Sequence, residues 1–151
     1  MPITVRTRQK ELKKNPWQMM VICQMLNQTS YKQVDRVSPV FFERWPTPQA
    51  LINADQTEVI EVLRPLGFYN RRAASLLNFS RGWLELKDPL STPIETLAKL
   101  KGIGKYAIDS WRIFQLNDLS VEPTDKVLIE YIKAARHNIY ETISNTSSSE
   151  I

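Results

Sequence analysis

The sequence contains a single cysteine, Cys23, and a single histidine, His137. One cysteine excludes an internal disulfide and any four-cysteine zinc or iron–sulfur site within the chain. So few ligands also argue against a catalytic transition-metal site, and the lone histidine argues against a Ser-His-Asp triad. No apolar run approaches the roughly 18 residues of a membrane span, and the N-terminus lacks the apolar core of a signal peptide. We therefore expect an intracellular protein with no membrane partner and no metal centre.

Glycine is scarce too, with four residues in 151, yet Gly102 and Gly104 stand only two positions apart. Positive charge is in excess, with a net charge of +4 and a pI near 9.3. The basic residues gather in the N-terminal "RTRQKELKK", in the pair Arg71–Arg72 and around the glycines, at Lys99, Lys101 and Lys105. A basic surface favours a polyanionic partner, although solubility alone would also explain a charge of this size.

Helical periodicity runs through most of the chain, with almost no strand alternation. The prolines and glycines fall between the periodic segments. We expect an all-α fold of about eight helices in one domain, 16–143, after a basic, partly ordered segment, 1–15. The polar tail, 144–151, has the composition of a disordered terminus. The expected helices span 16–26, 31–45, 48–53, 56–64, 70–84, 94–100, 105–116 and 125–136.

Local signals support the helix starts and the core. Asn15 precedes a proline at the first helical position, and Asp55 with Glu58 has the pattern of a capping box. Cys23 lies in an apolar segment, where we expect a buried, inert thiol. The aromatic side chains at core-like helical spacing are those of Trp17, Trp45, Trp83 and Trp111.

The stretch "LKGIGKYAIDSWRIF" joins two expected helices through Lys-Gly-Ile-Gly. Gly102 and Gly104 allow a positive φ and leave the backbone bare, while Ile103 can pin the hairpin to the core. The amides that follow lie at a helix N-terminus, which attracts anions, and Lys101 and Lys105 add positive charge. The alternative is a plain connector with a glycine C-cap. The full pattern, L-x-G-I-G-x-Y-A-x-D, resembles the helix–hairpin–helix motif that binds the DNA backbone.

Asp125 follows in "VEPTD", at the start of the last expected helix. It could serve only as an N-cap, together with Thr124. However, the helix–hairpin–helix DNA glycosylases carry a catalytic aspartate at a helix start about twenty residues after the hairpin, and this segment resembles theirs. Cleavage of an N-glycosidic bond develops positive charge at the sugar C1′, which a fixed carboxylate stabilises while it orients water. The resemblance therefore implies that Asp125 is catalytic.

Position 106 bears on the type of reaction. Members of this superfamily that also cut the strand carry a lysine nucleophile just after the hairpin, where this chain has Tyr106. The adjacent Lys105 would point about 100° away on a helix. We expect a monofunctional glycosylase that releases the base with water as nucleophile and has no lyase activity.

Three longer segments strengthen the resemblance: "NPWQMMVICQMLNQTSYKQV", "VLRPLGFYNRRAASLLNFS" and "LKGIGKYAIDSWRIF". Together they are similar to the catalytic domain of the thymine/uracil glycosylases that animals fuse to a methyl-CpG-binding domain. The resemblance implies roles for two sets of residues. Those of the base pocket are Tyr106, the pyrimidine-reading Gln9 and Lys126. Those that fill the gap in the duplex, wedge it and contact the orphan guanine are Gln28, Leu66, Gly67 and Phe68.

Two positions depart from that family. Gln28 stands where the family has an arginine, so charge-assisted contacts to flanking phosphates are lost. Lys126 directly follows Asp125, one position earlier than the family's lysine, which puts its contact to base or phosphate in question. Gln9 could also be an exposed residue of a basic arm.

The function that we expect is excision of thymine or uracil mispaired with guanine in double-stranded DNA, the first step of base excision repair. The protein would act as a monomer without a cofactor, with a cation possible on the hairpin carbonyls, and in the nucleus if the cell is eukaryotic. One alternative is a DNA-binding module without catalysis. The others are an adenine glycosylase acting opposite oxidised guanine and an endonuclease III-like enzyme, which the missing cysteine cluster and the missing lysine at 106 disfavour.

Overall fold

The computed structural model describes residue 9 and residues 12–149, and within α9 it places the side chains of residues 126–139 and 142. The described part is all-helical, with eight α-helices, two short 3-10 helices and no strand. This confirms the all-α prediction. No helix in the described ranges is long and apolar enough to cross a membrane. The α-helices are α2 (Pro16–Met25), α3 (Tyr31–Arg44), α4 (Pro48–Ile52), α5 (Gln56–Leu63), α6 (Tyr69–Leu84), α7 (Ile94–Leu97), α8 (Lys105–Phe114) and α9 (Lys126–Ser149), and the 3-10 helices are η1 (Arg64–Leu66) and η2 (Pro89–Ser91).

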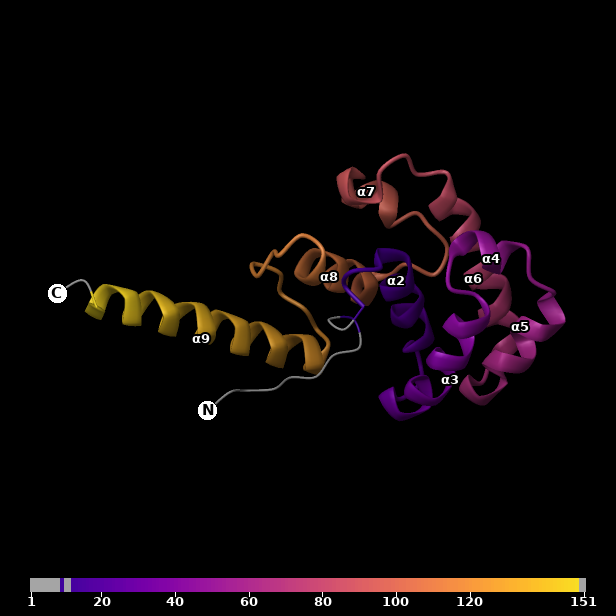
Figure 1. Ribbon diagram of the computed structural model, residues 1–151, viewed down its shortest axis with the longest axis horizontal. Helices are drawn as coiled ribbons and strands as arrows, with labels where there is room; N and C mark the ends of the chain where they lie inside the picture. Colours follow the sequence, from indigo (N-terminus) through magenta and orange to yellow (C-terminus); the bar gives the residue numbers. More distant parts are fainter. Residues whose placement is uncertain (1–8, 10–11, 150–151) are drawn as a thin grey trace.

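Helix α2 is central to the fold, since it packs against α3, α6 and α8 (Figure 1). It is buried on nearly every side because its sequence, PWQMMVICQM, is apolar around its whole circumference. Asn15 caps it, with Oδ1 accepting from the Gln18 amide at 3.1 Å, as predicted. The four tryptophans are at most 8% exposed, which confirms that they belong to the core.

Helix starts agree with the sequence better than helix ends. Asp55 caps α5 by accepting from the Thr57 amide at 2.9 Å. The predicted capping box does not form, because the carboxylate of Glu58 pairs with Arg44 at 2.8 Å. Helix α7 stops at Leu97 rather than at residue 100.

Helix α9 projects from the rest of the molecule (Figure 1) and continues to Ser149, through residues 144–149, where the sequence predicts a disordered tail. No proline or glycine follows Pro123, and each serine costs only about 0.5 kcal/mol of helix propensity relative to alanine, so nothing in the sequence forces the helix to end.

Candidate active site

The two glycines of the hairpin between α7 and α8 differ in conformation, and only Gly102 has the positive φ that glycine allows. Gly102 has φ of +79°, and a Cβ there would stand 2.2 Å from Oε1 of Gln24. The positive φ therefore favours glycine at this position, and a Cβ would in addition displace the end of the Gln24 side chain. Gly104 has an extended backbone, and a Cβ there would meet nothing within 4 Å. Packing does not demand glycine at 104, so its effect is to leave the backbone open to a ligand.

The N-terminus of α8 follows at once. No side chain caps this helix, so its first amides face the space beside Gly104 with the positive end of the helix dipole. Ile103 packs against the hydrophobic core, as predicted. The carbonyls of Leu100 and Gly104 already accept hydrogen bonds from the amides of Ile103 and Ile108. A cation bound to the hairpin carbonyls stays a prediction.

The lysines of the hairpin differ from each other. Lys101 is exposed. Lys105 donates from Nζ to the carboxylate of Asp109 at 2.8 Å and to the carbonyl of Glu122 at 3.2 Å. The Asp109 side chain is only 7% exposed. The positive charge that the sequence predicts at position 105 therefore lies beside the hairpin, but its ammonium is already paired within the protein.

A cleft of about 680 Å³ joins the hairpin to Asp125. Asp125 is partly exposed at its rim, and its Oδ2 accepts from the Leu128 amide at 3.0 Å. The residue is thus both the N-cap of α9 and a carboxylate beside the hairpin backbone. Lys126 is exposed and does not line the cleft. The lining residues are Cys23, Leu26, Asn27, Gln28, Gly102, Ile103, Gly104, Lys105, Tyr106, Ala107, Thr124 and Asp125.

A cluster of polar groups lies where Tyr106 enters the cleft. The amide Nε2 of Gln9 donates to the Tyr106 hydroxyl, which lies 3.2 Å from the hydroxyl of Tyr31. Burial raises the pKa of both phenols, so both stay protonated at neutral pH. Gln9 is fully buried and its Oε1 has no hydrogen-bond partner. It is therefore not an exposed residue of a basic arm, although it does not itself line the cleft.

Cys23 and Tyr31 belong to this site but were not predicted as site residues. The Cys23 thiol is buried, and burial raises its pKa to about 12, opposed in part by the side chains of Ser110 and Gln9. The apolar pattern of α2 indicates only that Cys23 is buried. Nothing in the sequence indicates that the Tyr31 hydroxyl reaches position 106.

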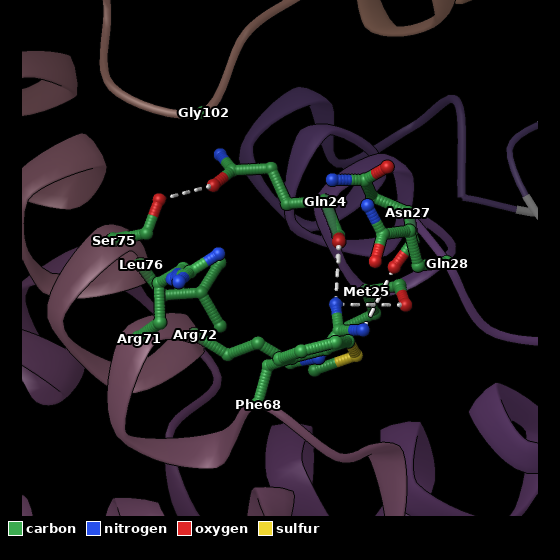
Figure 2. Close-up of a pocket in the computed structure, with 10 residues that line it drawn as sticks. All are labelled: Gln24, Met25, Asn27, Gln28, Phe68, Arg71, Arg72, Ser75, Leu76 and Gly102. Atoms are coloured by element: carbon green, nitrogen blue, oxygen red, sulfur yellow. Dashed lines mark hydrogen bonds between the residues drawn. The ribbon is translucent and has the colours of Figure 1, made fainter.

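A smaller cavity of about 110 Å³ adjoins the cleft and shares Asn27, Gln28 and Gly102 with it (Figure 2). Gln28 is exposed on one side and Phe68, 56% exposed, on the other. Leu66, which the resemblance includes in the wedge, is 5% exposed and lies in the core, because η1 turns it inward. The exposed apolar residue beside Gly67 is therefore Phe68 alone.

Comparison with known proteins decides the family. A model described as "HhH-GPD superfamily base excision DNA repair protein" matches residues 21–135. The chain belongs to this superfamily. Its hairpin, Asp125 and the cleft between them all lie in the matched region.

Among relatives of this HhH-GPD protein, a thymine-DNA glycosylase of Aeropyrum pernix is 36% identical over 94 residues, 61% of this chain and 42% of that protein. An adenine DNA glycosylase of Mycobacterium tuberculosis is 36% identical over 93 residues, 61% of this chain and 30% of that protein. A solved thermostable thymine-DNA glycosylase superposes with a TM-score of 0.60 at 19% identity, over 68% of this chain and 48% of that one, which shows a shared fold. The chain spans less than half the length of each.

Proposed function

We propose that this protein is a monofunctional DNA glycosylase that removes thymine or uracil mispaired with guanine. The observation that carries the proposal is one cleft lined by the Asp125 carboxylate, the bare backbone of Gly104 and the ring of Tyr106. A phosphate held at the start of α8 would present its nucleotide to the carboxylate. The guanine opposite, the monomeric state and a nuclear location in a eukaryotic cell belong to the same proposal.

The reaction would be a hydrolysis at the sugar. The bond from C1′ to the base nitrogen breaks, and the departing base takes the electron pair and then a proton from the solvent. Positive charge develops at C1′ and is stabilised by Asp125. A bond from C1′ to the oxygen of water forms, and the proton of that water passes to the carboxylate. The products are the free base and an abasic site, and the scheme needs no cofactor.

The polar cluster supports a uracil-like base. Uracil and thymine carry an N3–H donor between two carbonyl oxygens, whereas N3 of cytosine is an acceptor. The Oε1 of Gln9 is a buried acceptor without a partner, and such an atom is costly unless a ligand satisfies it. An extruded base that reached Gln9 past Tyr106 could donate N3–H to this oxygen. The phenol of Tyr106 would contact the same ring.

The chemistry of the neighbouring side chains supports a reaction without strand cleavage. A lyase needs a neutral amine that can attack C1′. Tyr106 offers a phenol whose raised pKa keeps it protonated. Lys105 offers an amine, but that amine is bound to Asp109. Water is then the nucleophile.

The test is excision from labelled duplexes that contain one G·U or one G·T pair, followed by alkali to cut the abasic site. Asp125→Asn should lower single-turnover excision by about 10²–10⁴-fold, while folding is kept because asparagine is also a good N-cap. Glu122→Gln is the matched control, since it removes an exposed carboxylate from the same loop. Binding without cleavage by the unaltered chain would favour a DNA-binding module.

Because one of the similar proteins is an adenine DNA glycosylase, the excision assay should include a second substrate. A duplex with adenine opposite 8-oxoguanine belongs in the same panel. Preferential cleavage of that duplex would show that the enzyme is a glycosylase for a different base, and would contradict a role of Gln9 as the acceptor for a pyrimidine N3–H.

A further inference from the structure

Arg72 lies inside the protein, although it belongs to a sequence pair whose other member, Arg71, is exposed. Its side chain makes hydrogen bonds only to backbone carbonyls, and no acidic side chain pairs with it among the residues that the structure describes. Burial lowers the pKa of its guanidinium. A buried cation without a counter-ion is costly, so the hydrogen bonds of its guanidinium must offset that cost.

The guanidinium bridges two loops that are about 40 residues apart in sequence. Figure 2 shows its bonds to the first of them. Its shortest bonds run from Nη2 to the carbonyl of Asn27 at 2.7 Å and from Nε to the carbonyl of Gly67 at 2.8 Å. The first loop follows the C-terminus of α2, where unpaired carbonyls favour a cation. The longer bonds, of 3.2–3.5 Å, go to the carbonyls of Gln24, Met25 and Leu66.

Each of the two shortest bonds fixes the peptide group that precedes an unusual residue. Gln28 follows Asn27 and has φ of +60°, and Phe68 follows Gly67 and has φ of +46°. L-residues other than glycine adopt this left-handed region only when surrounding contacts hold them there. Both side chains line the same cavity. Arg72 therefore links the two loops that carry these side chains.

We propose that Arg72 is a positioning residue for base extrusion, holding Gln28 and Phe68 as one rigid pair that enters the duplex. The inference deepens the proposed function and depends on it. Extrusion from a duplex requires a side chain to fill the gap and another to unstack the neighbouring step. In a single strand neither is needed. Loss of Arg72 should therefore impair excision from duplex DNA much more than excision from a single strand.

The experiment compares single-turnover excision of uracil from a G·U duplex and from the same strand unpaired. Arg72→Lys keeps the charge but offers one nitrogen in place of the Nε and Nη2 that reach Gly67 and Asn27, so the planar fork that spans the two loops is lost. We expect the duplex to single-strand ratio of rates to fall about tenfold or more, with circular dichroism confirming a folded variant. Arg81→Lys, on an exposed turn of the same helix, is the control and should leave the ratio unchanged. A merely structural role would lower both rates together, and an unchanged ratio would overturn the proposal.

A double-mutant cycle tests whether Arg72 acts through the pair. In a Gln28→Ala/Phe68→Ala background, Arg72→Lys should have almost no further effect on the duplex rate, since the side chains that it positions are gone. Additive losses would overturn the proposal. If the unaltered chain released a base from none of the duplexes, that result would instead contradict the proposed function.

Hydrogen exchange of the unaltered chain tests the clamp if Arg72→Lys does not fold. The amides of Thr29 and Gly67, in the two bridged loops, bond to the carbonyls of Leu26 and Arg64. If one guanidinium holds both loops, these amides should become exchangeable in one opening event, with equal opening constants. Opening constants that differ by about tenfold or more would show independent loops and would overturn the proposal.

Discussion

The side-chain amide of Gln9 donates a hydrogen bond to the hydroxyl of Tyr106, 97 positions later in the sequence. This bond ties the segment before α2 to the first turn of α8, at the point where the hairpin opens into the cleft. It also leaves Oε1 of Gln9 as a buried acceptor. The contact therefore has two consequences that can be measured separately: it positions the phenol of Tyr106, and it leaves an acceptor on Gln9 for an extruded base.

Replacement of Gln9 by alanine should lower excision of uracil and thymine by about 10- to 100-fold, the worth of one lost hydrogen bond to a buried group. Tyr106→Phe should have a smaller effect, since the ring stays and only the hydroxyl is removed. Single-turnover rates on G·U and G·T duplexes provide the measurement. Gln33→Ala, which truncates an exposed glutamine, is the control. Unaltered excision rates in the Gln9→Ala variant would show that Gln9 does not contact the extruded base.

Replacement of the two hairpin glycines by alanine should affect the stability of the protein differently. Gly102→Ala puts a Cβ at φ of +79°, which costs about 1 kcal/mol, and forces the Gln24 side chain to turn away. Its melting temperature should fall by about 2–4 °C per kcal/mol. Gly104→Ala meets open space and should melt like the unaltered protein.

DNA affinity gives the second half of this comparison. The methyl group of Gly104→Ala would stand where a phosphate approaches, and the dissociation constant for duplex DNA at fixed salt should rise roughly tenfold, the worth of a hydrogen bond to a charged group. Equal affinity of Gly104→Ala and the unaltered protein would mean that DNA does not contact the hairpin there.

The sequence predicts those features that depend on local chemistry. Helix starts follow from caps such as Asn15, and burial of the tryptophans follows from their spacing. Side chains that reach across the fold are harder to predict. Arg72 reads as surface charge beside Arg71, yet its donors meet carbonyls of two loops that only the tertiary structure brings together. Leu66 reads as part of a wedge, yet one 3-10 turn moves it into the core.

A lysine at position 106 should convert the reaction. Tyr106→Lys places an amine among buried groups beside Asp125, and burial lowers the pKa of a lysine, which leaves more of it neutral and nucleophilic. We expect a covalent adduct with uracil-containing duplex on borohydride treatment, and strand cleavage without alkali. The unaltered protein should show neither, because its nearest amine, on Lys105, is bound to Asp109. Trapping of the unaltered protein would contradict monofunctional hydrolysis.

Cys23 should make the protein less stable in alkali. Its pKa is raised from 9.0 to about 12 in the folded state, so the folded protein holds a proton that the unfolded chain releases. Stability from this group is complete below pH 9 and is lost as the pH rises from 9 towards 12. Between pH 8 and pH 10 the loss amounts to about 1 kcal/mol, since one proton is worth roughly 1.4 kcal/mol per pH unit. Tyr31 and Tyr106, whose pKa values are also raised, add to the slope at higher pH.

Urea unfolding of the unaltered chain and of Cys23→Ala at pH 8 and pH 10 isolates the contribution of the thiol. Truncation leaves a small cavity and lowers stability at both pH values. The decrease between pH 8 and pH 10 should be smaller in the variant by about 1 kcal/mol, because the thiol no longer contributes to it. Equal decreases in both proteins would mean that the thiol ionises as readily inside the fold as outside it. That result would place Cys23 in contact with water, and the inner wall of the cleft would then be wet before any base enters it.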